Sequence, residues 1–368
     1  MIVNNRNLGI YIHVPFCISK CPYCDFYSVV PENVEKYVYA VCREIRKWGR
    51  NSKNIVDTIY FGGGTPSLLK SDMIGEIIEC IYENFKVLNP EITMEINPAD
   101  YIFLDFEKLK NFGLNRVSVG AQSFSDLELK SLGRRHNKND VLLTLNSLQK
   151  AHIDNISLDL MLGIPHQGEE SIKNFVDLCF KNNVKHISAY LLKIEKGTGF
   201  YFNRDRLNLP SDDRSAELYE YAVKILEKMG YQQYEISNFS VPNFESKHNL
   251  KYWNLDEYIG IGPSAHSLFR GKRFYYKSSL NDFIEHSDVF EEGEFEPEIE
   301  YIMLRMRLIE GLNSEKFEKK FGKNIPKIYF KRAEKYSKTS FLTYDENGIR
   351  LTKKGFLLSN TVIGEILG

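Results

Sequence analysis

The sequence has few cysteines, no long apolar run and almost no net charge. Its 368 residues include 6 cysteines and we expect no signal peptide, so the disulfide framework of a small secreted protein is not indicated. No apolar run approaches the roughly 18 residues that a membrane-spanning helix requires. The formal net charge of -1 excludes a chain that is basic overall, and we find no repeat or low-complexity linker. With 43% hydrophobic and 26% charged residues, the composition is that of an ordinary globular protein.

Three of the six cysteines stand close together, at Cys17, Cys21 and Cys24, directly after the apolar run 10–16. This C-x3-C-x2-C spacing puts three thiols on one short loop, near enough to hold three corners of a [4Fe–4S] cluster. Such clusters normally take four cysteines, and Phe26 stands at the natural fourth position, so one iron would stay open to a small molecule. A zinc site is the weaker alternative, because it needs four ligands and only His13 lies nearby. The other three cysteines lie in helix-like stretches and are expected in the core: Cys42, Cys80 and Cys179.

From residue 8 to about 195, short β-type runs alternate with amphipathic helical patterns. The expected strands are Gly9–Val14, Thr58–Phe61, Thr93–Ile96, Arg116–Val119, Ser157–Met161 and His186–Leu192. The helical patterns are Val34–Trp48, Asp72–Phe85, Asp126–Leu132, Asp140–His152, Ser171–Asn182 and 212–229. This alternation predicts an α/β fold with a parallel sheet and right-handed crossovers. Because the distinctive residues follow the strands, where barrels build their sites, we expect a TIM-barrel-like arrangement, open or closed, and not a flat sheet.

A different pattern begins near residue 290. The stretch 231–275 is rich in aromatics and glycine, and from Pro297 two or three helices lead to a hairpin over 341–352. The hairpin is expected to turn at Asn347-Gly348, and a closing helix begins at Lys354. We therefore expect a core barrel over 1–230, an aromatic and Gly-rich extension over 231–290, and a small α+β winged-helix-like domain over 291–368.

Glycines and polar side chains mark the ends of the expected strands. The run 62–66, Gly-Gly-Gly-Thr-Pro, lets the backbone approach a ligand closely, although a tight strand-to-helix turn explains it equally well. Buried acids and amides are costly without partners. Glu95, Gln122 and Asp159 are therefore either ligand contacts at a barrel rim or internal braces. Arg134 is either a solvated cation or a clamp for a carboxylate.

Together these motifs resemble the radical S-adenosylmethionine (SAM) superfamily, and over essentially the whole chain its oxygen-independent coproporphyrinogen III oxidase-like branch. The resemblance implies a partial, open (β/α)6 barrel that holds a [4Fe–4S] cluster and SAM, whose sulfonium is split by an electron from the cluster. By motif position, the cluster ligands are Cys17, Cys21 and Cys24. The resemblance also implies these SAM contacts: Tyr11, Tyr23, Gly63, Gly64, Thr65, Glu95, Gln122, Arg134 and Asp159.

Two subgroups of this branch look similar. Coproporphyrinogen III dehydrogenases, which oxidatively decarboxylate two propionates to vinyl groups, carry a fourth cysteine and a longer segment before the motif. This chain has Phe26 at the fourth place and 16 residues before Cys17. The second subgroup, radical-SAM-type haem chaperones, resembles this chain at 24–28 and at 234–239, and its H-N-x-x-Y-W motif appears at 248–253.

The H-N-x-x-Y-W motif suits haem chemically. A neutral imidazole is a possible axial ligand, and aromatic rings offer a flat apolar surface to a porphyrin. We therefore expect haem contacts at His248, Tyr252 and Trp253, with His266 as a second candidate ligand. The ordinary alternative is a structural histidine among aromatics.

The chaperone resemblance implies transfer of haem to acceptor haem proteins, including respiratory ones, with SAM not consumed repeatedly. It also implies a cytoplasmic protein with transient membrane contact, and a homodimer is a further expectation. A radical enzyme acting on a porphyrinogen is the alternative. The stretch 311–368 has 12 Lys and Arg against 6 Asp and Glu. Such a basic stretch could bind anionic lipid or an acidic partner, or it could simply be a solvated surface. A nucleic-acid-modifying enzyme is a third hypothesis, but the barrel segment has no comparable basic run, so no nucleic acid is expected.

Overall fold

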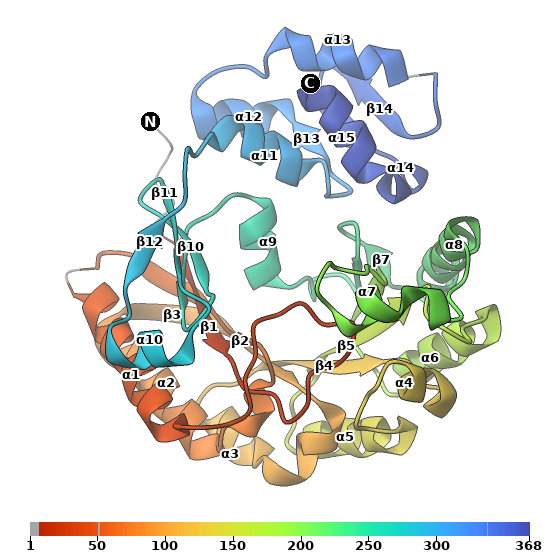
Figure 1. Ribbon diagram of the computed structural model, residues 1–368. Helices are drawn as coiled ribbons and strands as arrows, with labels where there is room; N and C mark the ends of the chain where they lie inside the picture. The colour runs from red at the N-terminus through yellow and green to blue at the C-terminus, as the bar shows by residue number, and fades with distance from the viewer. Residues whose placement is uncertain (1–6, 51, 337) are drawn as a thin grey trace.

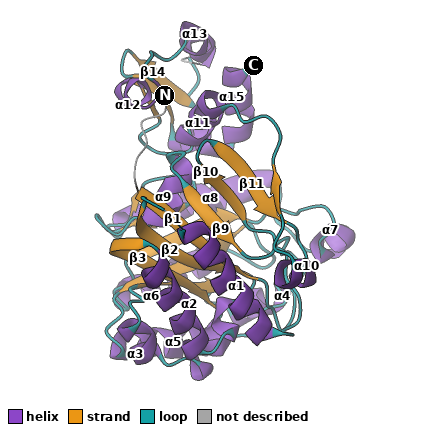
Figure 2. Cartoon of the chain, turned by 90° about the vertical axis from the view of Figure 1, so that its left-hand side faces the viewer, coloured by secondary structure: helices purple, strands orange, loops and turns teal. Residues whose placement is uncertain are grey.

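The computed structural model describes residues 7–50, 52–336 and 338–368. A 12-stranded sheet runs through its larger part in the order β12-β11-β10-β9-β1-β2-β3-β4-β5-β6-β8-β7. The sheet is open, because β12 and β7 at its two edges do not pair with each other. Helices cover its outer side, and a smaller lobe formed by the C-terminal elements lies beside it (Figure 1; Figure 2). This arrangement confirms the open α/β barrel with a small C-terminal domain.

The six expected strands form the parallel centre of the sheet, although each differs from its expected bounds by up to several residues. They are β1 (Asn7–Val14), β2 (Ile55–Gly63), β3 (Lys86–Ile96), β4 (Arg116–Gln122), β5 (Asn155–Leu162) and β6 (His186–Leu191). Every neighbouring pair among them is parallel. Alternate residues point to opposite faces of a strand. In β1, for example, Ile10 and Ile12 are fully buried in the apolar core, whereas Tyr11 between them faces the concave side.

Helices connect the strands and bury their apolar faces against the outer side of the sheet. They are α1 (Val34–Gly49), α2 (Ser71–Asn84), α3 (Phe106–Asn111), α4 (Asp126–Ser131), α5 (Lys138–Lys150), α6 (Glu169–Lys181), α7 (Gly199–Asn203) and α8 (Asp212–Lys228). Short 3-10 turns lie at Pro66–Leu68, Pro98–Phe103 and Arg204–Arg206. The sequence did not predict the short helices α3 and α7. The three cysteines outside the loop are buried, as expected: Cys42, Cys80 and Cys179.

The aromatic and Gly-rich stretch adds strands to both edges of the same sheet. On one side β9 (Tyr258–Ile261) pairs in parallel with β1, and three antiparallel strands follow: β10 (His266–Phe269), β11 (Lys272–Tyr276) and β12 (Val289–Glu291). On the other side lie β8 (Asn238–Ser240) and β7 (Gln232–Gln233). Helix α9 (Lys247–Trp253) connects the two edges and lies between the sheet and the C-terminal lobe (Figure 1).

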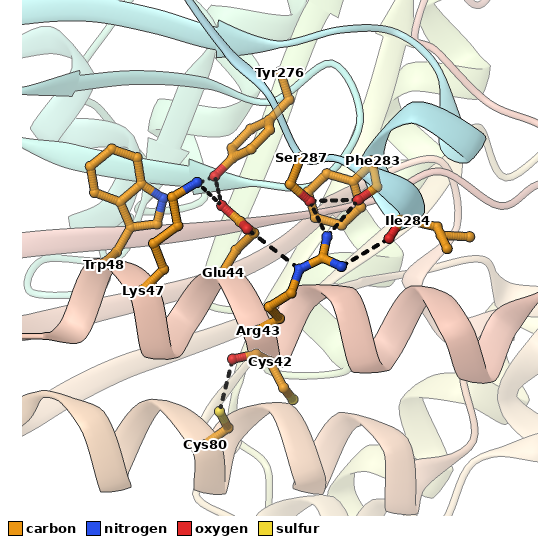
Figure 3. A network of polar contacts seen from close by, with 10 residues as sticks. All are labelled: Cys42, Arg43, Glu44, Lys47, Trp48, Cys80, Tyr276, Phe283, Ile284 and Ser287. Carbon is orange, nitrogen blue, oxygen red and sulfur yellow. Dashed lines mark hydrogen bonds and ion pairs between the residues drawn. The ribbon is translucent and has the colours of Figure 1, made fainter.

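A polar network fastens this added sheet edge to α1 (Figure 3). Glu44 on α1 is 2% exposed and accepts hydrogen bonds from the Tyr276 hydroxyl and from Lys47, both at 2.9 Å. Trp48 Nε1 donates to the same Tyr276 oxygen at 2.9 Å. Arg43 donates to carbonyl oxygens of α10 (Leu280–Glu285) at 3.0 Å. The network joins residues more than 200 positions apart, so this extension and the parallel strands are held as one layer.

The C-terminal lobe is built around a second apolar core, which also includes Leu255, Tyr258 and Leu268 from the neighbouring sheet edge. Its elements are α11 (Pro297–Arg305), β13 (Leu312–Asn313), α12 (Ser314–Phe321), α13 (Lys327–Tyr336), β14 (Leu342–Asp345), β15 (Gly348–Leu351), α14 (Lys353–Leu357) and α15 (Ser359–Leu367). The predicted hairpin is present, but Asp345 pairs with Gly348, so its turn residues are Glu346 and Asn347. The expected limits near residues 230 and 290 stay predictions. Among the described residues, no helix is both long and apolar enough to cross a membrane.

Candidate functional site

The three-cysteine motif lies on the loop between β1 and α1, at the carboxyl end of β1. Backbone hydrogen bonds fold this loop back on itself: Cys17 N donates to Val29 O at 2.9 Å, and Val29 N donates to Pro15 O at 2.7 Å. Cys24 N donates to Cys21 O at 3.0 Å and closes a tight turn. All three thiols are free and half-buried. The loop therefore holds three unpaired sulfur atoms at one end of the sheet.

The three thiols border one cavity of about 180 Å³, which we call the small cavity. Cys24 lines it directly, Cys17 Sγ lies 3.3 Å from Thr65 Oγ1 in its wall, and Cys21 Sγ accepts from Arg134 Nη1 at 3.5 Å. Burial raises the pKa of Cys24, and the neighbouring thiols Cys21 and Cys17 raise it further. Arg134 places a positive charge beside the Cys21 sulfur. A group held by all three thiolates would face the small cavity, so the residues present fit the cluster inferred from the sequence.

His13, the nearby residue that could have completed a zinc site, is not free to bind a metal. His13 Nδ1 lies 3.1 Å from the Tyr11 hydroxyl and Nε2 lies 3.1 Å from Tyr27 O, so both ring nitrogens are engaged. Burial lowers the pKa of His13 to about 4, which keeps the ring neutral. Within the described residues, no three His, Cys, Asp or Glu side chains are grouped to hold a single metal ion. A four-iron cluster is larger than one ion and separates its ligands more widely, so this finding bears on zinc and not on the cluster.

The small cavity collects eight of the nine residues expected to contact SAM. Its lining includes Tyr23, Gly63, Gly64, Thr65, Glu95, Gln122, Arg134 and Asp159. Except for Arg134, which follows α4, these residues come from the cysteine loop, from β2 to β5 and from the turn after β2, which explains how positions 136 residues apart meet. The ninth, Tyr11, lines a different cavity. The role of all nine as SAM contacts stays a prediction.

The glycine turn after β2 is needed for packing and also lies at the small cavity. Gly63 has φ +106°, and a Cβ there would lie 2.6 Å from the His13 ring. A Cβ on Gly64 would lie 2.7 Å from Phe16 O. Both positions therefore require glycine for packing against the cysteine loop. Both glycines also line the small cavity, so the turn exposes backbone to that cavity, and its contact with a ligand stays a prediction.

Two carboxylates in the small cavity are deeply buried. Glu95 Oε1 accepts from the Tyr60 hydroxyl at 2.8 Å, and burial raises the pKa of Glu95 to about 7. Asp159 Oδ1 accepts a long hydrogen bond from Ser118 Oγ at 3.4 Å, and burial raises its pKa to about 6. Carboxylates whose pKa values are raised by burial are common in binding sites.

The amide and the guanidinium of the small cavity are held in fixed positions. Gln122 has φ +65°, which is costly for a residue with a side chain, and its Oε1 accepts from the Tyr190 hydroxyl at 2.7 Å. Arg134 donates to Gly120 O at 2.7 Å and to the Tyr23 hydroxyl at 3.4 Å. Arg134 is therefore not a solvated cation. It ties the cysteine loop to the end of β4.

Tyr11 lines a second cavity of about 450 Å³, which we call the side cavity. This cavity also contains Tyr252 and His266, two of the candidate haem residues. Asp25 and Phe26 from the cysteine loop form part of its wall. Phe26, which stands where a fourth cysteine would be, is 65% exposed and borders the small and side cavities alike.

His248 of the H-N-x-x-Y-W motif is buried inside the molecule at 1% exposure. Its Nδ1 lies 2.8 Å from Thr58 Oγ1 and its Nε2 lies 2.8 Å from the Tyr252 hydroxyl. The ring stacks on Tyr60 with 5.1 Å between centroids, and burial lowers the pKa of His248 to about 3. Both nitrogens are thus occupied by protein partners. Haem ligation by His248 stays a prediction, and it requires the loss of one of these bonds.

The other haem candidates are more accessible. Tyr252 presents its ring to the side cavity, while Trp253 is half-buried at the end of α9 and is not among the residues that line that cavity. The His266 side chain is 55% exposed, stacks on Tyr275 and forms an ion pair with Glu292. Of the two candidate histidines, His266 alone faces the side cavity.

Several residues of the site were missed by the sequence analysis. They lie in a central cavity of about 490 Å³ that adjoins the small cavity: Tyr60, Arg116, Ser118, Ser188, Tyr190 and Asn249. The available signal was the alternation within the strands, because apolar residues pack against the helices and polar residues between them line the concave face. In β4 the polar residues Arg116, Ser118 and Gln122 alternate with apolar or small ones, and of these three only Gln122 was predicted as a site residue.

Comparisons with known proteins agree with this geometry. Residues 11–179 match the family model described as Radical SAM superfamily, and residues 299–358 match the HemN C-terminal domain. The chain is 34% identical to the Heme chaperone HemW of Lactococcus lactis over 97% of this chain and 96% of that protein. It is 32% identical to the protein of the same name from Bacillus subtilis, over 97% and 98%. The structure of the Escherichia coli coproporphyrinogen III oxidase superimposes with a TM-score of 0.82 over 98% of this chain and 90% of that one, at 20% identity, which bears on the fold alone.

Proposed function

The chain belongs to the HemW family of radical SAM proteins, and we propose that it is a haem chaperone that binds haem beside a cluster-and-SAM site and transfers it to acceptor haem proteins. Membership of the radical SAM superfamily implies an Fe–S cluster and SAM. In this proposal Cys17, Cys21 and Cys24 hold a [4Fe–4S] cluster, which offers SAM an open iron and an electron.

The residues of the small cavity would hold SAM. Glu95 and Asp159 would accept hydrogen bonds from its polar groups, which removes the cost of two incompletely satisfied buried carboxylates. Gly63 and Gly64 would let the ligand lie against bare backbone. Arg134 keeps positive charge beside Cys21 and fixes the loop against Gly120.

The observation that carries the haem part of the proposal is the position of α9. Two residues of its H-N-x-x-Y-W motif reach cavities that adjoin the cysteine loop: Asn249 lines the central cavity and Tyr252 lines the side cavity. We propose that Tyr252 contacts the porphyrin and that His266, in the same cavity, supplies an axial nitrogen. His248 orients Tyr252 through its 2.8 Å hydrogen bond, and Trp253 flanks the helix end.

The cellular setting is part of the same proposal. A cluster and unpaired thiols suit the reducing cytoplasm. The basic stretch 311–368 would meet anionic lipid or an acidic acceptor, with two copies of the chain forming the transfer-competent dimer.

The test is a haem titration of the anaerobically reconstituted protein, followed by the Soret band. Wild type should bind one haem saturably. His266→Ala should shift the Soret maximum because an axial ligand is lost, and His248→Ala should bind more weakly because Tyr252 is released. His286→Ala, which removes a histidine that is 63% exposed elsewhere on the surface, is the matched control and should bind as wild type does. Absence of saturable binding in wild type would overturn the chaperone proposal and favour radical chemistry on a porphyrinogen.

A further inference from the structure

We propose that Arg116, on the floor of the central cavity, binds a carboxylate of the cargo, namely a propionate of haem. This inference rests on the proposed function and names the group that the barrel interior recognises. It assigns the central cavity a role separate from the small cavity.

Arg116 is a buried cation without a partner. It is 2% exposed and ranks among the largest fully buried side chains of the protein. Its backbone pairs with both flanking strands, but its side-chain Nε is buried with no acceptor among the described residues. Buried charges are normally paired and hydrogen-bonded, because an unpaired one is costly. An unpaired guanidinium that lines a cavity therefore indicates that an anion from outside the chain completes it.

The neighbours of Arg116 reinforce this reading. Thr93 and Asn155 lie beside it in register on the two flanking strands. Thr93 Oγ1 and Asn155 Oδ1 are likewise buried without hydrogen-bond partners. Three adjacent residues at the base of the barrel thus have unused polar atoms, a concentration that the protein alone does not satisfy.

Two carboxylates that share the central cavity with Arg116 do not form an ion pair with it. Glu95 and Asp159 feel its charge, which opposes the effect of burial on the pKa of each, but neither forms an ion pair with it. Both line the small cavity as well as the central one, whereas Arg116 lines only the central cavity. Arg116 is therefore outside the expected SAM contacts and faces a second ligand.

The chemistry of the central cavity fits a carboxylate attached to an apolar body. A guanidinium presents a planar fork of donors that matches a carboxylate. Apolar and aromatic side chains line part of the walls, with Met161, Leu191 and Tyr190 among them. The lining also includes four carboxylates, so Arg116 is the buried group in this cavity that favours an anion: Asp25, Glu95, Asp159 and Glu195. Asn249 of the H-N-x-x-Y-W motif lines the same space and connects it to the proposed haem site. Haem combines both features, since its ring is apolar and its propionates are anionic.

The test compares haem with haem dimethyl ester, in which both propionates are uncharged, on wild type and Arg116→Gln. Hydrogen bonds to charged groups are strong, so the ester should bind wild type roughly tenfold or more weakly than haem does. Arg116→Gln should bind both forms equally, at the affinity of the ester for wild type. Lys193→Gln removes an exposed cation at the edge of the same cavity and should keep the wild-type preference for haem.

Each outcome is decisive. Equal binding of haem and its ester by wild type would overturn the inference and leave the chaperone proposal standing. This comparison uses wild type alone, so it does not depend on whether a variant folds. A preference for haem that survives in Arg116→Gln would overturn it also. Absence of haem binding in wild type would overturn both proposals. Thermal melting and cluster absorbance verify the fold of Arg116→Gln, and Arg116→Lys, which keeps the charge but loses the fork, should bind haem with intermediate affinity.

Discussion

The cysteine loop and helix α9 carry two motifs of similar sequence prominence, but their side chains have opposite environments. The three cysteines of the loop are half-buried and unpaired; Cys24 lines the small cavity, and the sulfurs of Cys17 and Cys21 lie against residues of its wall. In α9, His248 is buried and both of its ring nitrogens are bonded within the protein. The cysteine motif can bind a ligand with its side chains as they stand. The histidine of the α9 motif instead bonds to other residues of the protein. A motif thus identifies residues that act together, but not whether they face a ligand or one another.

The largest effect is expected in the cysteine loop. Cys21→Ala should abolish the brown absorbance of the reconstituted cluster and with it SAM cleavage, because two thiolates cannot hold the cube. Cys42→Ala, which removes a thiol buried between α1 and α2, should keep the absorbance in full. The comparison is made by iron analysis and visible spectra after anaerobic reconstitution. A full-occupancy cluster in Cys21→Ala would contradict the assignment of the loop.

The next effect concerns α9. His248→Ala should lower the free energy of unfolding by about 4 kcal/mol, because it opens a cavity and strands the buried hydroxyls of Thr58 and Tyr252. His266→Ala, at a side chain 55% exposed, should change it by less than about 0.5 kcal/mol. Chemical denaturation of the two variants measures the contrast. Equal destabilisation by both variants would show that the buried contacts of His248 do not contribute to the free energy of unfolding.

The sequence predicted more of the loop than of α9, for physical reasons. The spacing of the three thiols indicates the ligands of one cluster within one short loop. The alternation of strands and helices predicts a parallel sheet, in which the carboxyl ends of later strands lie at the same edge as that loop. Nothing local to His248 specifies that Thr58, 190 residues earlier, meets its ring. The strands β9 to β12 were not predicted because they are short and depend on pairing with β1 and with one another. Arg116 was missed because its significance lies in the absence of a partner, which only the tertiary structure reveals.

The smallest effect is a difference in pH dependence between the two regions, measured on protein without cluster or SAM. Burial raises the pKa of Glu95 from 4.5 to about 7, so the folded state binds a proton that the unfolded state releases. Stability from this group is complete below pH 4.5 and is lost as the pH rises towards 7. Burial lowers the pKa of His248 from 6.5 to about 3, so stability from this group is present above pH 6.5 and is lost as the pH falls.

These opposite signs give each region its own signature in unfolding experiments between pH 5 and 7.5. Relative to wild type, Glu95→Gln should gain roughly 2–3 kcal/mol as the pH rises across this range, because it no longer loses the proton-linked stability. His248→Gln should lose roughly 2 kcal/mol over the same range, because it no longer gains any. Denaturant titrations of both variants at several pH values test the pair together. If the stabilities of the two variants changed with pH in the same direction relative to wild type, Glu95 or His248 would lack the pKa shift assigned to it. The contrast between the small cavity beside the cysteine loop and the closed α9 would then fail at that residue.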